Sequence, residues 1–424
     1  MTGRYKAYPE YKNSVSSWCG IVPSHWNDIK FKWILEEKKK VSNPALPSGS
    51  ISFGEVILKN EDSLAPETKA SYQEVLVGEL LINPLNLNFD LKSLRTALST
   101  INVVVSTGYI VAYIDKELNS NYMRWLMHQF DVSHMKTMGS GVRQTINFTD
   151  IANSAVCIAP YEEQQKIANF LDHETAKIDT LITKQEKLIE LLKEKRQAVI
   201  SHAVTKGLNP DAPMKDSGVE WLGEVPEHWI TKSYRYACKI YRGKFGHRPR
   251  NDPAFYDGKY PFIQTGDVAR AGKYIKNYKQ TLNEKGIGVS QKFPEGTLMM
   301  AIAANIGDTA ILGFEAYAPD SVVGFKPKAD IDLEFLRYSF MAALPALEQT
   351  STQSTQANLN VDRIGAVQAS FPTISEQKKI VKHLDILLDR YNEIELKGKN
   401  SIELMSERKT ALISAAVTGK IDVR

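Results

Sequence analysis

The stretch that decides the organisation of this chain is EQQKI at Glu163–Ile167, which returns as EQKKI at Glu376–Ile380. A second stretch, AVIS at Ala198–Ser201, returns as ALIS at Ala411–Ser414. Both pairs are offset by 213 residues (376 − 163 and 411 − 198), so the whole segment between them is repeated without a gap. A repeat of this kind predicts one structural unit that the chain uses twice.

Each copy of the repeat predicts one long helix, because apolar residues recur at the seven-residue period of a coiled-coil seam. The predicted seam positions of the first copy are Ile167, Leu171, Ile178, Leu181, Leu188, Leu192 and Val199. Those of the second copy are Ile380, Leu384, Leu387, Tyr391, Ile394, Met405 and Leu412. Neither helix can bury its apolar stripe alone. We therefore expect an antiparallel pair that holds two other domains a fixed distance apart.

A second repeat marks the entry to each half of the chain. WCGIVPSHW at Trp18–Trp26 returns as WLGEVPEHW at Trp221–Trp229, at an offset of 203 residues (221 − 18). The offset grows by ten residues between the two repeats, so the second variable domain is ten residues longer than the first. Short apolar or alternating runs bounded by Gly, Pro and Asn predict strands in both variable domains. The predicted fold class is therefore α+β, with an internal two-fold pseudo-repeat.

The predicted domain order follows from these repeats. It is an N-terminal arm (1–19), a first variable domain (20–158), a first long helix (159–207), a linker (208–219), a second variable domain (220–371) and a second long helix (372–424). The linker is predicted from its Pro, Asp and Gly residues. We expect the arm to dock on something else or to be partly disordered.

Composition limits the classes of protein that fit. The 424 residues allow two or more domains, and a net charge of only +4 means that any nucleic-acid surface must be local. The three cysteines are far apart and odd in number, which argues against a disulfide framework and for a reducing compartment. No apolar run is long enough to span a membrane. The expected location is the cytoplasm.

The whole plan resembles the DNA sequence-specificity subunit of type I restriction–modification systems. The likeness rests on the entry motifs, the helix starts and the exits AVTKG at Ala203–Gly207 and AVTGK at Ala416–Lys420, and it spans essentially the full chain. It implies two target-recognition domains, each reading one half of a bipartite, asymmetric DNA site. It also implies that the two helices set the spacer between the half-sites and bind two methyltransferase subunits.

The resemblance further implies that the chemistry lies on other chains. It places S-adenosylmethionine on the partner methyltransferase subunits, ATP and Mg on a partner restriction (motor) subunit, and no cofactor on this chain. Missing motifs agree with this expectation. The sequence has no phosphate-binding GxxxxGK[ST] loop, and NPLN at Asn83–Asn86 lacks the second Pro and the aromatic residue that an amino-methylating motif needs. We predict no catalytic residue and no metal site.

The strongest local signal for DNA contact is the segment from Lys232 to Arg250, which carries seven Lys or Arg residues, interleaved aromatic residues and no Asp or Glu. Basic side chains contact phosphates, and His or Arg can reach base edges. The predicted contacts are Lys232, Arg235, Arg242, Lys244, His247, Arg248 and Arg250. The alternative interpretation is a solvated edge strand that its lysines protect from aggregation.

Further candidates lie in a late motif of each variable domain, which is rich in Gly, Gln, Thr, Ser and Asn. Gln can bond to adenine and Arg to guanine in the major groove. The predicted contacts are Arg143, Gln144, Gln353 and Gln356, and Gln264 after a predicted strand. A plain polar turn is the alternative for each. Asn147 and Asn360 match across the halves and are expected to be structural. The alternative for the whole chain is a coiled-coil scaffold that binds proteins.

Overall fold

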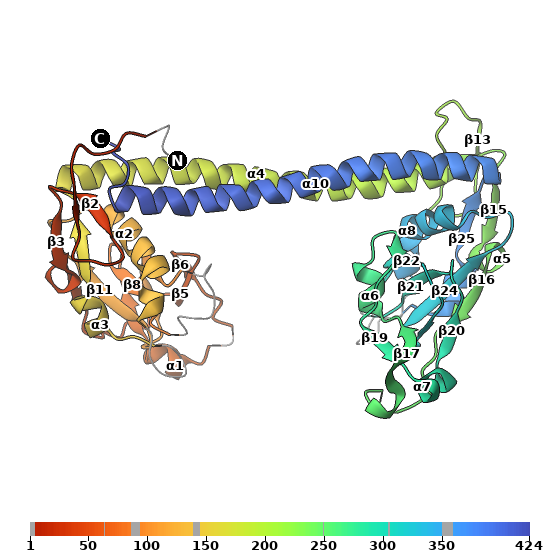
Figure 1. The fold of residues 1–424 in the computed structure, drawn as a ribbon, viewed down its shortest axis with the longest axis horizontal. Helices are drawn as coiled ribbons and strands as arrows, with labels where there is room; N and C mark the ends of the chain where they lie inside the picture. Colours follow the sequence, from red (N-terminus) through yellow and green to blue (C-terminus); the bar gives the residue numbers. More distant parts are fainter. Residues whose placement is uncertain are drawn as a thin grey trace. The chain divides into compact units, whose positions relative to one another are not determined.

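The computed structural model of the chain describes residues 5–62, 64–85, 94–138, 145–248, 250–303, 306–349 and 359–424. The chain forms two compact units (Figure 1). Unit 1 consists of Met1–Gln185 together with Asn400–Arg424, and unit 2 of Glu186–Lys399. Two long helices, α4 (Tyr161–Lys206) and α10 (Ile374–Val417), each contribute to both units. Unit 1 is therefore discontinuous in sequence.

Unit 1 is built on an antiparallel four-stranded sheet in the order β4-β11-β8-β9. Its strands are β4 (Leu35–Glu37), β11 (Ile110–Ile114), β8 (Leu80–Ile82) and β9 (Thr96–Leu98). Two-stranded ladders join β1 (Tyr11–Asn13) to β2 (Ile21–Pro23), β3 (Asn27–Lys30) to β12 (Ala155–Ile158), β5 (Gly49–Ser52) to β6 (Glu55–Leu58) and β7 (Gln73–Val75) to β10 (Val103–Val105). The helices are η1 (Phe31–Trp33), α1 (Pro66–Ala70), α2 (Ser120–Ser133), η2 (Met135–Thr137) and α3 (Phe148–Asn153).

Unit 2 has a five-stranded sheet in the order β16-β24-β21-β22-β18 and a four-stranded sheet in the order β19-β17-β23-β20. The first contains β16 (Cys238–Arg242), β24 (Val322–Pro327), β21 (Leu298–Ala301), β22 (Thr309–Leu312) and β18 (Tyr274–Ile275). The second contains β19 (Gln280–Leu282), β17 (Tyr256–Phe262), β23 (Ala316–Ala318) and β20 (Gln291–Phe293). Ladders join β13 (Met214–Asp216) to β14 (Glu224–Pro226) and β15 (Ile230–Ser233) to β25 (Gln368–Phe371). The helices are α5 (Tyr234–Ala237), η3 (Pro253–Phe255), α6 (Thr265–Arg270), α7 (Glu284–Val289), α8 (Leu333–Gln349) and α9 (Val361–Ala366).

The two units share one frame, as the sequence repeat predicts. Strands β4-β11-β8-β9 with helix α2 correspond to β16-β24-β21-β22 with α8, and the β3/β12 ladder corresponds to β15/β25. Unit 2 adds the edge strand β18 and the whole β19-β17-β23-β20 sheet, whereas the remaining described strands of unit 1 form only two-stranded ladders. The predicted α+β class with an internal pseudo-repeat is confirmed.

Each unit packs its globular core onto both long helices. The core of unit 1 contains Ile167 and Leu171 of α4 and Leu412 of α10, and that of unit 2 contains Ile200 of α4 and Leu384 of α10. Full burial of one such side chain stabilises the folded state by about 1.5–3 kcal/mol. The start of α4 thus meets the end of α10 in unit 1, and the end of α4 meets the start of α10 in unit 2. The predicted antiparallel pairing is confirmed within each unit.

The predicted seam of each helix consists of two series of positions, each with a period of seven residues. The structure confirms one series and displaces the other by one residue. Leu171, Ile178, Leu192 and Val199, and likewise Leu384, Tyr391, Met405 and Leu412, are buried or half-buried. In contrast, Leu181, Leu188 and Ile394 are 53%, 43% and 42% exposed, and the side chain buried beside Leu188 is that of Ile189 (9%). The seven-residue repeat of the predicted seam was counted from Ile167. A globular core covers a wider part of the helix there, so Ile167 is a poor guide to the narrower seam further along.

The predicted N-terminal arm and the predicted linker both pack on their own units rather than on something else. In the described part of the arm, Tyr8 is 3% exposed, and the backbone of Lys6 pairs with that of Asp422. Within the linker, Met214–Asp216 forms β13 and pairs with β14. Both segments therefore extend the β-structure of the unit to which they belong.

Two further observations concern the cysteines and the helices. Cys19, Cys157 and Cys238 are free and buried, and desolvation raises the pKa of the Cys157 and Cys238 thiols to about 12. Among the residues that the structure describes, we find no helix with the length and apolar character needed to cross a membrane.

Candidate nucleic-acid interface

Each entry motif contacts one of the two long helices, and the contacts are the same in both units. In unit 1, Nε2 of His25 lies 2.7 Å from Oε1 of Glu163, and Nε1 of Trp26 donates to Oε2 of the same carboxylate at 3.0 Å. In unit 2, His228 and Trp229 contact Glu376 at 2.9 and 3.2 Å. Each carboxylate is the first residue of the EQxKI repeat, so the clamp joins the two sequence motifs that recur.

The next residue of the repeat has an equally matched role. Oε1 of Gln164 accepts from the backbone N–H of Asn119, which precedes α2, and Oε1 of Gln377 accepts from that of Asp332, which precedes α8. The distances are 2.9 and 2.7 Å. The repeated polar residues therefore fix each domain to its helices. A contact that both domains share cannot make them differ in what they bind, so any such difference must come from residues that are not matched.

Two of the predicted DNA contacts have partners within unit 2. Nζ of Lys232 lies 2.6 Å from Oδ2 of Asp330 and 5.5 Å from the centre of the Phe371 ring. The guanidinium of Arg235 donates to the carbonyl oxygens of Asp362 and Gly365 in α9, both at 3.3 Å. Because these contacts join β15 to Asp330 and α5 to α9, we explain these two residues as structural.

The remaining cations of the segment are exposed. Arg242, at the end of β16, and Lys244 make no side-chain ion pair or hydrogen bond with any described residue. Nη2 of Arg250 lies 2.6 Å from Oδ2 of Asp320, and Nη2 of Arg248 lies 3.6 Å from the same oxygen. Among the described residues, Arg242 and Lys244 are unpaired, and Arg248 and Arg250 share the single carboxylate of Asp320. This surface therefore has an excess of positive charge, as phosphate binding requires.

His247 and Gln264 are both held in place by neighbours. Nε2 of His247 lies 3.0 Å from Oδ2 of Asp252, and its ring stacks on Phe255 with centroids 4.0 Å apart. Gln264 precedes helix α6, and its side-chain amide donates to Oε1 of Gln280. The side chain of His247 is about one-third exposed, so the base contact predicted for it would need Asp252 to release the ring.

A cavity of about 310 Å³ lies beside this basic segment in unit 2. We call it the aromatic cavity, and its lining includes Phe245, Arg250, Tyr256, Phe262, Gln264, Thr265, Gln280, Pro319 and Ser321. The rings of Phe245 and Tyr256 are 5.8 Å apart and roughly parallel. The sequence prediction missed Gln280 and Ser321, because they lie in separate segments of the chain, β19 and the turn between β23 and β24. The aromatic residues interleaved with the cations were the only local signal.

The late-motif candidates Arg143, Gln144, Gln353 and Gln356 lie outside the described residues, so their DNA contacts stay predictions. The matched Asn147 and Asn360 are described, and both cap helices. Oδ1 of Asn147 accepts from the backbone N–H of Asp150 at the start of α3, and Oδ1 of Asn360 accepts from that of Asp362 at the start of α9. Such caps stabilise a helix by about 1 kcal/mol.

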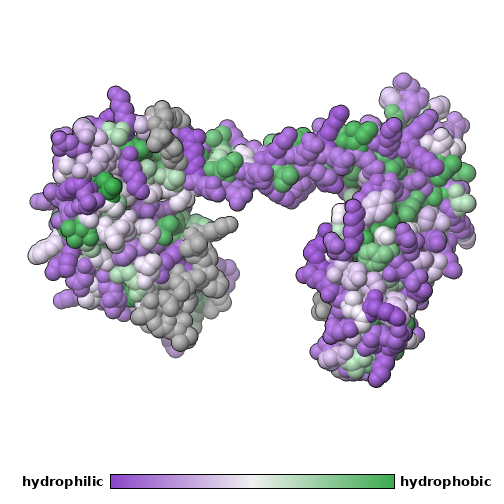
Figure 2. Space-filling model, in the orientation of Figure 1, coloured by the Kyte–Doolittle hydropathy of each residue, from purple (hydrophilic) through white to green (hydrophobic). Residues whose placement is uncertain are grey.

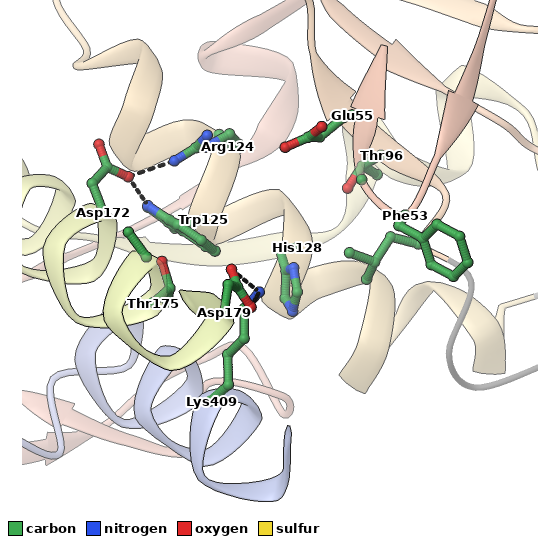
Figure 3. Close-up of a pocket in the computed structure, with 13 residues that line it drawn as sticks. Phe53, Glu55, Thr96, Arg124, Trp125, His128, Asp172, Thr175, Asp179 and Lys409 are labelled. Carbon is green, nitrogen blue, oxygen red and sulfur yellow. Dashed lines mark hydrogen bonds and ion pairs between the residues drawn. The ribbon is translucent and has the colours of Figure 1, made fainter. Parts of the chain in front are cut away.

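A second cavity, of about 360 Å³, lies in unit 1 where domain 1 meets α4 and α10 (Figure 3). Arg124 and Trp125 of α2 both donate to Oδ1 of Asp172, and Nζ of Lys409 lies 2.7 Å from Oδ1 of Asp179. The carboxylates are thus neutralised by neighbouring cations. Burial, with the nearby charges of Lys409 and Arg124, lowers the pKa of His128 to about 4. These contacts tie the first variable domain to the helices and leave no excess of positive charge for DNA.

These observations define a class: a two-domain scaffold that carries a local basic surface and repeated helices. Comparison with known proteins gives the family. The model of the type I restriction modification DNA specificity domain matches residues 90–191 and 238–404, more than half of the chain. The chain belongs to this family and carries two such domains. It is therefore a specificity subunit of a type I restriction–modification system, with DNA-recognition domains.

Individual relatives agree over the whole length. A Methanocaldococcus jannaschii protein that bears the name of a type I restriction enzyme MjaX specificity subunit is 22% identical over 96% of both chains. A chain from a structure of complex assembly and conformational transition of the type I R-M system matches with a TM-score of 0.71, 14% identity and coverage of 93% of this chain and 98% of that one. The HsdS subunit from Thermoanaerobacter tengcongensis matches with a TM-score of 0.51, 14% identity and coverage of 94% and 98%. Both structural likenesses concern the fold.

Proposed function

We propose that each domain reads one half of a bipartite, asymmetric DNA site and that α4 and α10 set the spacer between the halves. One observation carries this proposal. The two domains share a frame whose matched residues, such as Glu163 and Glu376, hold the helices, while their remaining surfaces differ. A protein built to read one symmetric site would gain nothing from two unlike domains.

In unit 2 the DNA contacts centre on the exposed end of the basic segment. Arg242 and Lys244 are free to bind phosphates, and Arg248 and Arg250 share one carboxylate between them. Phosphate contacts position a protein on DNA, whereas contacts to base edges supply specificity. The aromatic cavity and the polar residues around it, including Gln264, provide the base-reading part of this surface.

The long helices offer matched docking positions for two methyltransferase subunits, one on each copy of the repeat. Leu181 and Leu191 of α4 are 53% and 47% exposed, and their counterparts Ile394 and Leu404 in α10, 213 residues later, are 42% and 64% exposed. Such side chains appear as apolar spots on an otherwise polar helix surface (Figure 2). Exposed apolar positions that recur at one offset favour contact with two copies of the same partner.

We further propose that the chain works in the cytoplasm without a cofactor of its own. The methyltransferase subunits would carry S-adenosylmethionine, and the restriction subunits would carry ATP and Mg. This chain would supply the choice of sequence.

Mapping of methylated adenines in host DNA tests the proposal directly. The chain is co-expressed with the methyltransferase subunit of its own system, and we expect one bipartite motif with an undefined central spacer. Replacing residues 20–158 by the first domain of a relative should change one half of that motif and leave the other unchanged. A complex that assembles and binds S-adenosylmethionine, yet leaves the host DNA unmethylated, would favour the protein-binding scaffold instead.

Salt dependence of DNA binding tests the basic segment. We expect the double variant Arg242→Ala/Lys244→Ala to reduce the slope of log K against log salt by about 2, since each phosphate contact contributes about 0.9. Lys232→Ala is the matched control, because its ammonium group pairs with Asp330 of the same unit and joins β15 to that segment. An unchanged slope in the double variant would move the phosphate contacts to other residues.

A further inference from the structure

The aromatic cavity of unit 2 is explained neither by the shared frame nor by phosphate binding. Its floor is apolar and buried, since Phe245 and Phe262 are 3% and 2% exposed and Pro319 is also buried. Phe245, Phe262 and Leu282 form a small core of their own, separate from the main core of the unit. A volume of about 310 Å³ is at the low end for a small-molecule site, so it has room for one flat ring system but not for a peptide.

Polar side chains above this floor have hydrogen-bonding capacity to spare. Thr265, Gln280 and Ser321 are half-buried. In the part of the chain that the structure describes, the hydroxyls of Thr265 and Ser321 make no hydrogen bond. Oε1 of Gln280 accepts from Gln264, while the amide nitrogen of Gln280 donates to no described residue. Two hydroxyls and an amide can both donate and accept, as the edge of a nucleobase requires.

Two cations lie on the segment beside the cavity, and one of them, Arg250, pairs with Asp320. Arg250 is exposed and lines the cavity itself. The unpaired Lys244 precedes the floor residue Phe245, and its backbone N–H donates to the carbonyl of Ala318, next to Pro319. Positive charge therefore lies on the segment that forms one wall. A site that combines a stacking surface, edge-reading polar groups and adjacent cations matches the parts of a nucleotide.

We propose that the aromatic cavity receives one nucleobase that turns out of the duplex within the half-site read by unit 2. This inference rests on the proposed DNA-reading function. The base lies against the aromatic floor, its edge bonds to Gln280, Thr265 and Ser321, and Arg250 and Lys244 hold the flanking phosphates. The sheet β19-β17-β23-β20 supplies Tyr256, Phe262 and Gln280, and the described part of unit 1 has no such sheet. The extrahelical base therefore belongs to one half-site only.

Single abasic positions in the target duplex test this proposal. The target is the motif found by methylation mapping, and the protein is the complex with its methyltransferase subunits. Removing the base opposite each position of the half-site normally lowers affinity, because base contacts are lost. At a position whose base leaves the stack, removing its partner raises affinity, because less pairing must be broken. We expect a rise of about tenfold at one position besides the methylated adenine.

Cavity variants assign that position. Gln280→Ala, and Ser321→Phe, which fills the cavity, should abolish the rise at the second position and leave any rise at the methylated adenine unchanged. Gln291→Ala is the matched control, because Gln291 lies in β20 at the other edge of the same sheet and its amide bonds to the backbone of Lys292. The response retained at the methylated adenine shows that a variant has folded and assembled.

Each other outcome overturns the inference in a distinguishable way. If the wild-type complex binds and methylates its bipartite site but shows no second position, the proposed function stands and the extrahelical base does not. If a second position exists but Gln280→Ala and Ser321→Phe leave it unchanged, the base does not enter this cavity. If the complex fails to bind a bipartite site at all, the proposed function fails together with the inference.

Discussion

At the scale of single residues, the two helix clamps are alike in design but unequal in burial. The side chain of Glu163 is 10% exposed, and that of Glu376 is 29% exposed. Glu163 also accepts from the hydroxyl of Tyr8 at 3.1 Å and lies 3.7 Å from the guanidinium of Arg424. Desolvation and the Glu163 charge raise the pKa of Tyr8 above its usual range, so Tyr8 stays a donor.

This difference predicts unequal effects of removing the two carboxylates. We expect Glu163→Ala to lower the free energy of unfolding of unit 1 by ~2–4 kcal/mol, because it leaves buried donors unpaired. Glu376→Ala should lower that of unit 2 by only ~1–2 kcal/mol, since water can replace more of its contacts. Urea unfolding measures both, with the exposed Glu162→Ala as control. Equal losses would show that the clamps do not differ in strength.

His128 predicts a loss of stability on acidification. Its folded-state pKa of about 4 lies below the ordinary value of 6.5, so the unfolded state binds a proton first as the pH falls. The contribution of neutral His128 is therefore complete above pH 6.5 and decreases steadily towards pH 4. By linkage the decrease is about 2 kcal/mol at pH 5.

The nearby Asp131 opposes this trend, because burial raises its pKa to about 6. The test therefore compares the wild type with His128→Gln, in which Asp131 is unchanged. Urea unfolding at pH 7 and pH 5, followed by tryptophan fluorescence, to which the adjacent Trp125 contributes, should show the larger acid loss in the wild type. Parallel losses in the two proteins would rule out this role for His128.

At the scale of helices, the displaced seam separates residues that stabilise the fold from residues that are free to bind a partner. Ile178 is 5% exposed and lies in the core of unit 1, whereas Leu181 is 53% exposed. We expect Ile178→Ala to lower the free energy of unfolding by ~2–4 kcal/mol and Leu181→Ala by less than ~0.5 kcal/mol. Urea unfolding distinguishes them. If Leu181→Ala is as damaging as Ile178→Ala, the seam has the predicted phase after all.

Sequence reasoning succeeded at this scale where the signal was periodic or repeated. The predicted helix at 159–207 corresponds to α4 at Tyr161–Lys206, because its apolar stripe continues through the whole segment. Leu181 was assigned to the seam wrongly because an apolar residue buried by a globular core cannot be distinguished in the sequence from one buried by a partner helix. The aromatic cavity could not be predicted, since Phe245 and Ser321 come together only through the pairing of distant strands. Similarly, nothing in the sequence shows that Lys232 already has an acidic partner.

At the scale of the whole molecule, the two ends of the chain complete one unit. Beyond the backbone pairing of Lys6 with Asp422, the guanidinium of Arg424 lies 4.9 Å from the centre of the Tyr8 ring. The left-handed Gly419, at φ +69°, turns the chain after α10 beside Pro23 and Trp26, and Gly207, at φ +79°, does the same after α4 beside Pro226 and Trp229. After α4, the chain runs on directly into β13, which pairs with β14 of unit 2. After α10, the residues that follow Gly419 instead pair with the N-terminal arm of unit 1.

Removing residues 420–424 should therefore destabilise unit 1 and spare unit 2. We expect faster amide hydrogen exchange around Tyr8 and the start of α4, with no change around Trp229 and the start of α10. Mass spectrometry of peptides from the two units gives both readings in one experiment, and unit 2 is the internal control. Equal exchange in the truncated and full-length chains would show that the tail is dispensable.

The discontinuity of unit 1 also governs how the protein is made. A ribosome releases residues 1–185 long before residues 400–424 exist, so the first domain must wait, with part of its apolar surface uncovered, while all of unit 2 is synthesised. The Lys409–Asp179 pair spans 230 residues of sequence and cannot form until α10 has been synthesised. The first domain thus emerges before unit 2 and is completed after it. A nascent chain that stalls before α10 would expose this surface to chaperones and proteases.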